Sequence, residues 1–130
     1  MYTLTAEAFE RWLQDYKAAW EARDSAAAAA LFASDAEYYW TPFDPPQRGR
    51  VEIAAAWEGA VLKQKNVTFD YSVLAVAAAK GVAHWHTRLT SVPQGEEVEL
   101  DGVVIAEFAG AGQCRTFREW WHVKSGADDG

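Results

Sequence analysis

Several residue types and patterns are scarce in this sequence. A single cysteine, Cys114, excludes an internal disulfide and favours a reducing cytoplasm. No apolar stretch approaches the roughly 20 residues that span a bilayer, and no basic segment with a long apolar run opens the chain, so we expect neither a membrane span nor a signal peptide. The 12 basic residues are outnumbered by 19 acidic ones, and a formal charge of −7 argues against binding to nucleic acid or to an anionic membrane. We therefore expect one soluble, cytoplasmic domain.

Aromatic residues, in contrast, are plentiful. The 130 residues include seven Trp, six Phe and five Tyr, more than a core of this size needs. A chain of this length typically buries roughly two-thirds of its unfolded surface, which leaves room for a core with a cavity. The surplus of rings points to a pocket lined by aromatic side chains.

The first part of the chain has the pattern of helices. Thr5 is placed to cap a first helix, and Leu4 and Phe9 have the spacing of a hydrophobic staple. Asp24 is placed to cap a second, alanine-rich helix that ends near residues 31–32. Apolar side chains recur at helical spacing along one stripe of the first helix: Phe9, Trp12, Leu13, Tyr16 and Trp20.

Three consecutive aromatics and three of the four prolines follow. The segment AEYYW, residues 36–40, predicts a short strand because aromatic residues favour pleated backbone. Pro42, Pro45 and Pro46 predict a stiff loop, since proline continues neither a helix nor a ladder. A third helix is predicted from about residue 51 to residue 62.

From residue 67 onward the hydrophobic period changes to two. Turn-like segments at 80–81, 93–95 and 109–112 separate the strand-like ones. Helices followed by an antiparallel meander predict an α+β fold, with three helices packed on one face of a strongly curved, mostly antiparallel sheet. We expect a single domain over residues 1–124 and a polar tail over 125–130. The four predicted strands are 67–77, 81–92, 97–108 and 113–123.

Alternation along the strands separates two faces. In the second strand of the meander, one set is apolar and should face the helices, while His84, His86 and Arg88 form the opposite set. In the last strand both sets mix polar and aromatic residues, so alternation alone does not choose between them. The apolar set of the second strand is Ala83, Trp85, Thr87 and Leu89.

The order of elements and several short segments resemble the nuclear transport factor 2-like superfamily, a cone-shaped α+β barrel. The segment YKAAWEARDSAAAAALFASDAEY is similar to that superfamily's first helix pair and first strand, PPQRGRVEIAAAW to the start of its third helix, and AEFAGAGQCRTFREWW to its final hairpin. The resemblance covers nearly the whole chain. It is greatest to the SnoaL-like branch, which includes polyketide cyclases, limonene-epoxide hydrolases and ketosteroid isomerases.

The resemblance implies four catalytic candidates. Glu119 stands where the last strand of these relatives carries an inward acidic residue. Tyr39 and Thr41 stand where the epoxide hydrolases hold a nucleophilic water, and Tyr16 matches the tyrosine that ketosteroid isomerases direct at the developing oxyanion. On this basis Tyr39 and Thr41 face the cavity, and their neighbours 38 and 40 pack outside it.

The chain also departs from each relative. Trp85 and Thr87 stand where the epoxide hydrolases need an Arg and an Asp. The resemblance to ketosteroid isomerases implies one Asp near Trp40 or Thr41 and a second near Val104, and both are absent. The chain thus keeps part of each relative's catalytic set and the whole of none.

These residues predict proton-transfer chemistry without a cofactor. Aromatic neighbours would remove water from Glu119 and raise its pKa, as general acid–base catalysis near neutral pH requires. Tyrosine hydroxyls could stabilise a developing enolate, and the ligand would be a hydrophobic small molecule undergoing cyclisation, isomerisation, hydration or dehydration. The residues expected to bind it are Trp20, Phe43, Trp57, Trp85, Thr87, Val104, Phe117 and Trp121.

Structural interpretations remain open for the same residues. Glu119 could pair with a neighbouring arginine such as Arg115 or Arg88, and Tyr16 could be a half-buried core residue. The alternative function is a non-catalytic, dimeric module for ligand binding or interaction. His84 and His86 share a face but lack an evident third ligand, so we expect no metal site and an outer face that packs in a homodimer.

Overall fold

The computed structural model describes residues 2–110 and 112–125. Within these ranges, three helices and six strands make an α+β fold, as predicted. The predicted tail falls almost wholly on 126–130, outside the described residues, and Ser125 belongs to the last strand. The elements are α1 (Ala6–Glu21), α2 (Ser25–Ala29), β1 (Phe32–Tyr39), β2 (Gln47–Arg48), α3 (Gly49–Val61), β3 (Gln64–Ala77), β4 (Lys80–Ser91), β5 (Glu97–Gly110) and β6 (Gln113–Ser125).

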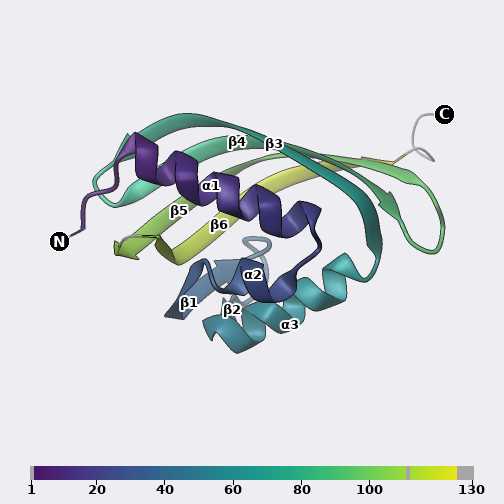
Figure 1. The fold of residues 1–130 in the computed structure, drawn as a ribbon, viewed down its shortest axis with the longest axis horizontal. Coiled ribbons are helices and arrows are strands. Elements are labelled where there is room, and N and C mark those ends of the chain that lie inside the picture. The colour runs from purple at the N-terminus through teal and green to yellow at the C-terminus, as the bar shows by residue number, and fades with distance from the viewer. Residues whose placement is uncertain (1, 111, 126–130) are drawn as a thin grey trace.

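One curved sheet organises the molecule. Its strand order is β2-β1-β6-β5-β4-β3, and every pairing is antiparallel except that of β1 with β6. Figure 1 shows α1 lying across the concave side of the long strands, with α2 and α3 beside β1. The sheet and the helices thus enclose a cone-like interior. No helix within the described ranges is long and apolar enough to cross a membrane.

The first two helices begin where the sequence places their caps. Thr5 Oγ1 accepts a hydrogen bond from the Ala8 N–H at 3.1 Å, and Asp24 Oδ1 accepts one from the Ala27 N–H at 3.0 Å. The second helix is shorter than predicted, because Phe32 already pairs with β6 and draws the chain into β1. The predicted stripe of α1 is buried throughout: Phe9, Trp12, Leu13, Tyr16 and Trp20.

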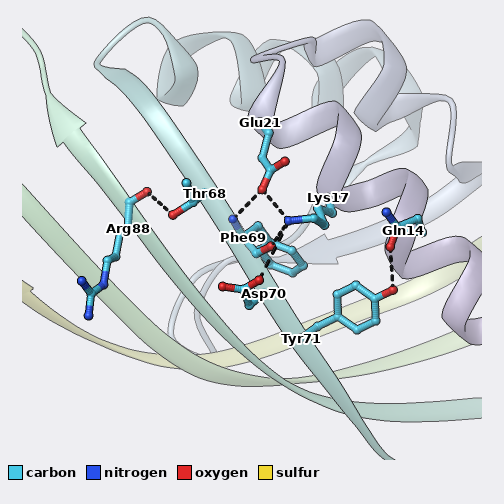
Figure 2. Close-up of polar contacts among 8 residues, drawn as sticks. All are labelled: Gln14, Lys17, Glu21, Thr68, Phe69, Asp70, Tyr71 and Arg88. Atoms are coloured by element: carbon cyan, nitrogen blue, oxygen red, sulfur yellow. Dashed lines mark hydrogen bonds and ion pairs between the residues drawn. The ribbon is translucent and has the colours of Figure 1, made fainter.

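The free edge of β3 is closed by side chains of α1. Glu21 Oε2 accepts hydrogen bonds from the Phe69 N–H at 2.8 Å and from Lys17 Nζ at 2.7 Å, and Lys17 Nζ also donates to the Phe69 carbonyl. Figure 2 shows this cluster together with Asp70 beside Lys17 and Tyr71 donating to Gln14. Because the cluster satisfies both backbone groups of Phe69 that β4 does not reach, α1 is fixed against the strand edge.

Gly81 has a different role from the one predicted. The turn between β3 and β4 lies at Ala78–Ala79, where Ala78 has φ +54°, and Lys80 and Gly81 already belong to β4. A Cβ at Gly81 would lie 2.5 Å from ring carbons of Phe9. The glycine is therefore needed for the close approach of α1 to the sheet.

Candidate functional site

A cavity of about 420 Å³ lies between the helices and the concave face of the sheet. Aromatic and aliphatic side chains make most of its wall. Lys63, Trp121 and Val123 are exposed to solvent and form its mouth. The complete lining is Tyr16, Trp20, Tyr38, Trp40, Trp57, Ala60, Lys63, Gln64, Trp85, Leu89, Val98, Leu100, Glu119, Trp121 and Val123.

Glu119 is the one carboxyl among these lining residues. It lies on β6 opposite Val104 of β5, and only 6% of its surface is exposed. Burial removes water from the charged form and raises the pKa of Glu119 to about 8, against a smaller lowering by a hydrogen bond from Tyr38. The carboxyl is therefore largely protonated at neutral pH.

Two tyrosines connect to this carboxyl in a chain of hydrogen bonds. Tyr38 Oη donates to Glu119 Oε1 at 3.3 Å, and the hydroxyls of Tyr16 and Tyr38 are 3.1 Å apart. Since the single hydrogen of Tyr38 is used on Glu119, Tyr16 is the donor to Tyr38. Burial, followed by the charge of Glu119, raises the pKa of both tyrosines well above the usual value.

The second oxygen of the carboxyl remains free. Glu119 Oε2 has no hydrogen-bond partner in the described part of the chain, and the residue lines the cavity. This oxygen is thus available to a bound molecule. The predicted alternative of an ion pair is wrong, because Arg115 pairs with Asp35 at 3.6 Å and Arg88 with Glu99 at 3.8 Å.

The predicted orientation of the first strand is also wrong. Tyr38 and Trp40 line the cavity, whereas Tyr39 lies on the outer face, 4.1 Å below the guanidinium of Arg118. Thr41 lies beyond the end of β1, where its Oγ1 accepts a hydrogen bond from the Phe43 N–H at 2.9 Å.

The pairing of β1 with β6 explains this orientation. Tyr38 is level with Phe117 and Tyr39 with Arg118. Neighbouring residues in a sheet share a face, so the inward side of β6 fixes Tyr38 inward. Three aromatics in a row carry no contrast of polarity, and the sequence of β1 alone therefore could not choose between them.

The residues expected to bind a ligand fall into three groups. Trp20, Trp57, Trp85 and Trp121 line the cavity, and Trp121 Nε1 also donates to the Trp40 carbonyl at 2.9 Å. Val104 and Phe117 instead line a hollow of about 10 Å³ that adjoins Glu119. The other two are not among the lining residues: Phe43 is 93% exposed, and Thr87 is fully buried, with an Oγ1 that lacks a hydrogen-bond partner among the described residues.

Sequence reasoning missed several lining residues besides Tyr38 and Trp40. Val98 and Leu100 are two apart on β5 and share its inward face, a pattern that period-two alternation could have revealed. Lys63 and Gln64 lie at the corner between α3 and β3, where no periodicity applies.

The histidines of β4 lie on the outer face. His84 Nε2 is 2.9 Å from Asp101 Oδ1, and His86 Nε2 is 2.5 Å from Glu99 Oε2. Within the described ranges, no group of three or more His, Cys, Asp or Glu side chains could hold a metal ion. These pairs instead make a polar band on the convex side of the sheet.

Comparison with known proteins supports the fold and the family. The family model described as the SnoaL-like domain matches residues 13–116. The chain belongs to this SnoaL-like family. The resemblance to the nuclear transport factor 2-like superfamily is thereby confirmed. No curated protein matches the chain significantly.

Solved structures with this fold include two similar ones. A Bacillus subtilis protein named provisionally as an isomerase superposes with a TM-score of 0.77 at 15% identity, over 89% of this SnoaL-like chain and 87% of its own. SalBIII, an epoxide hydrolase/cyclase-like enzyme with a role in pyran ring formation in the polyether salinomycin, superposes with a TM-score of 0.78 at 14% identity, over 90% and 95%. At these identities the two structures establish a shared fold only.

Proposed function

We propose that this SnoaL-like protein binds a hydrophobic small molecule in its cavity and transfers a proton to or from it through Glu119. The observation that carries the proposal is a buried carboxyl, with one oxygen free, in the wall of an aromatic-lined cavity of about 420 Å³. Apolar cavities with a few convergent polar groups are typical of small-molecule sites. The names of the two structural neighbours, a provisionally named isomerase and an epoxide hydrolase/cyclase-like enzyme, are compatible with chemistry of this class.

The hydrogen-bond chain gives each residue a role. Protonated Glu119 can donate to a carbonyl, epoxide or hydroxyl oxygen of the ligand, and the carboxylate that results keeps the hydrogen bond from Tyr38. Tyr16 donates to Tyr38 and strengthens that bond, since hydrogen bonds in a chain polarise one another. A carboxyl that can both give and take a proton serves cyclisation, isomerisation, hydration or dehydration without a cofactor.

The binding of a neutral aromatic probe, 2-naphthamide, should depend on pH through this carboxyl. An apolar ring beside Glu119 further disfavours its charged form, so affinity is expected to be constant below pH 7 and to fall about tenfold above pH 8 if binding adds one pKa unit. Calorimetric titration from pH 6 to pH 9.5 measures this fall. An affinity that is flat over the whole range would contradict the proposed role.

Matched variants identify the group responsible. Glu119→Gln should abolish the pH dependence and keep the affinity measured at pH 6. Tyr38→Phe should move the midpoint upward, because it removes the hydrogen bond that stabilises the carboxylate. Tyr39→Phe is the control on the outer face and should leave the curve unchanged.

Binding without catalysis is the second candidate function. The residues that line the cavity favour it, because they include one carboxyl and no histidine or cysteine. A mechanism with two catalytic groups would need a further base or nucleophile. Once a substrate is found, unchanged turnover in Glu119→Gln would favour this passive function.

We also propose a homodimer of a cytoplasmic protein. Trp120 is 45% exposed on the outer face, level with Val103 of β5, and an exposed tryptophan on a sheet favours a protein contact. The lone cysteine is buried and free, which is compatible with a reducing compartment. We expect sedimentation velocity to show a dimer, and we expect the Trp120→Ala variant to dissociate more readily. A wild-type protein that is monomeric at tens of micromolar would exclude the dimer.

A further inference from the structure

The mouth of the cavity carries a positive charge, although the net charge of the chain is −7. Lys63 lines the cavity and is exposed, and its ammonium forms no ion pair or hydrogen bond with any described residue. Its backbone is held at both groups: the N–H donates to the Ala60 carbonyl at 3.1 Å, and the carbonyl accepts from Val92 at 2.9 Å. The backbone that carries this free ammonium is thus fixed beside an apolar cavity.

The neighbours of Lys63 carry charges of both signs, and none of them pairs with its ammonium. Arg23 Nη1 donates to the Gln64 carbonyl at 2.9 Å, which brings a guanidinium next to the same corner. Gln64 is held by a hydrogen bond from Trp20 Nε1 to its Oε1 at 2.9 Å. The acids nearest along α2 and α3 have other partners: Asp24 caps α2, and Glu58 accepts from Ser25 at 2.7 Å. Both acids keep their charge, but neither pairs with Lys63, so its ammonium is left without a carboxylate partner among the described residues.

The interior does not oppose an anionic ligand at neutral pH. Glu119 is the one carboxyl in the lining, and its raised pKa, about 8, keeps it protonated under these conditions. The remaining wall is apolar or aromatic, apart from Gln64 and the two tyrosine hydroxyls. This arrangement suits a molecule with an apolar body and one negative end.

We propose that the ligand of this cavity carries a carboxylate, which pairs with the Lys63 ammonium at the mouth while its apolar body lies among the rings. This inference rests on the proposed function and names the substrate class. A single free ammonium balances a single negative charge, which favours a carboxylate over a doubly charged phosphate. Lys63 would then orient the molecule with its uncharged end toward Glu119.

The experiment compares two probes of the same shape, 2-naphthoate and 2-naphthamide, by calorimetry at pH 6.5. The naphthoate is expected to bind about threefold to tenfold more tightly, the range of a partly exposed ion pair at an apolar rim. Lys63→Gln should abolish this preference by weakening the binding of the naphthoate, and its effect on the amide should be clearly smaller. Lys65→Gln removes an equal charge two residues away, outside the lining, and should keep the preference.

The outcomes separate the inference from the proposed function. Equal affinities of the two probes, or a preference for naphthoate that survives in Lys63→Gln, would overturn the inference that the ligand carries a carboxylate. The proposal that the cavity binds a hydrophobic molecule would still stand. If neither probe bound the unaltered protein, both the carboxylate inference and the proposed cavity binding would be overturned. A preference that is lost in Lys63→Gln, kept in Lys65→Gln and reduced by salt would support the ion pair.

Discussion

Glu119→Gln is expected to make the protein more stable at pH 8.5 and to leave its stability almost unchanged at pH 4. In the folded protein the pKa of Glu119 is about 8, and in the unfolded chain it returns to the ordinary value of 4.5. Glutamine has nearly the same shape and accepts the same hydrogen bond from Tyr38 through its amide oxygen. The variant therefore removes the cost of the ionisable group and little else.

The sign follows from proton binding. Between pH 4.5 and pH 8 the folded state holds a proton on Glu119 that the unfolded state has lost, so the free energy of unfolding of the wild type falls as pH rises. A pKa difference of about 3.5 units, at about 1.36 kcal/mol per unit, corresponds to a loss of up to about 5 kcal/mol by pH 8. Above pH 8 both states are ionised and the loss is constant.

Thermal unfolding of both proteins from pH 4 to pH 9 measures the effect. At about 3 to 5 °C per kcal/mol for a domain of this size, a loss of about 5 kcal/mol means that the variant should melt about 15 to 25 °C higher at pH 8.5. Glu21→Gln is the control of opposite sign. Burial raises the pKa of Glu21, but the hydrogen bonds from Lys17 and the Phe69 N–H outweigh it and lower the pKa, so this variant should lose stability above pH 4.5. If the melting temperatures of the wild type and of Glu119→Gln changed with pH in the same way, the Glu119 carboxyl would be hydrated in the folded protein and the prediction would be wrong.

The sequence was sufficient wherever local chemistry decides structure. Thr5 and Asp24 cap their helices through side-chain hydrogen bonds to residues three positions on. In β4, alternation of apolar and polar residues predicted that Trp85 faces inward and His84 outward, and the burial of the strand follows that pattern. The inward position of Glu119 was inferred from family resemblance, because the polarity of β6 was ambiguous.

The parts that failed depend on contacts between distant residues. Tyr38 and Glu119 are 81 positions apart, and their hydrogen bond exists only because β1 pairs in parallel with β6. Because three aromatics stand in a row, assigning the inward face of the strand one residue off exchanges Tyr39 for Tyr38. That error changes which tyrosine hydroxyl reaches the Glu119 carboxyl. Lys63 was missed for a similar reason, since its place at the mouth depends on how α3 meets β3.

Gly102 lies between two strands of the cavity wall, where an added side-chain carbon has no room. It pairs with Trp85 of β4 and with Trp121 of β6, two residues that line the cavity. A Cβ at this position would collide with the Trp120 carbonyl oxygen, and it would lie 2.9 Å from Trp121 Cβ and 3.0 Å from Trp85 Cε2. Because the nearest obstacle is backbone, a side-chain rotation cannot relieve the clash.

Gly102→Ala is therefore expected to lower the free energy of unfolding by about 1 to 3 kcal/mol and to weaken binding of 2-naphthamide about tenfold or more, since both tryptophans must move.

Gly59→Ala is the matched control. Gly59 is exposed on α3 with open space around its Cβ position, so this variant should gain about 0.5 to 1 kcal/mol and bind the probe normally. Thermal unfolding and calorimetry of the two variants provide the comparison. A Gly102→Ala protein as stable and as competent as the wild type would mean that β5 and β6 do not approach at this position as described, and that the wall of the cavity is built differently.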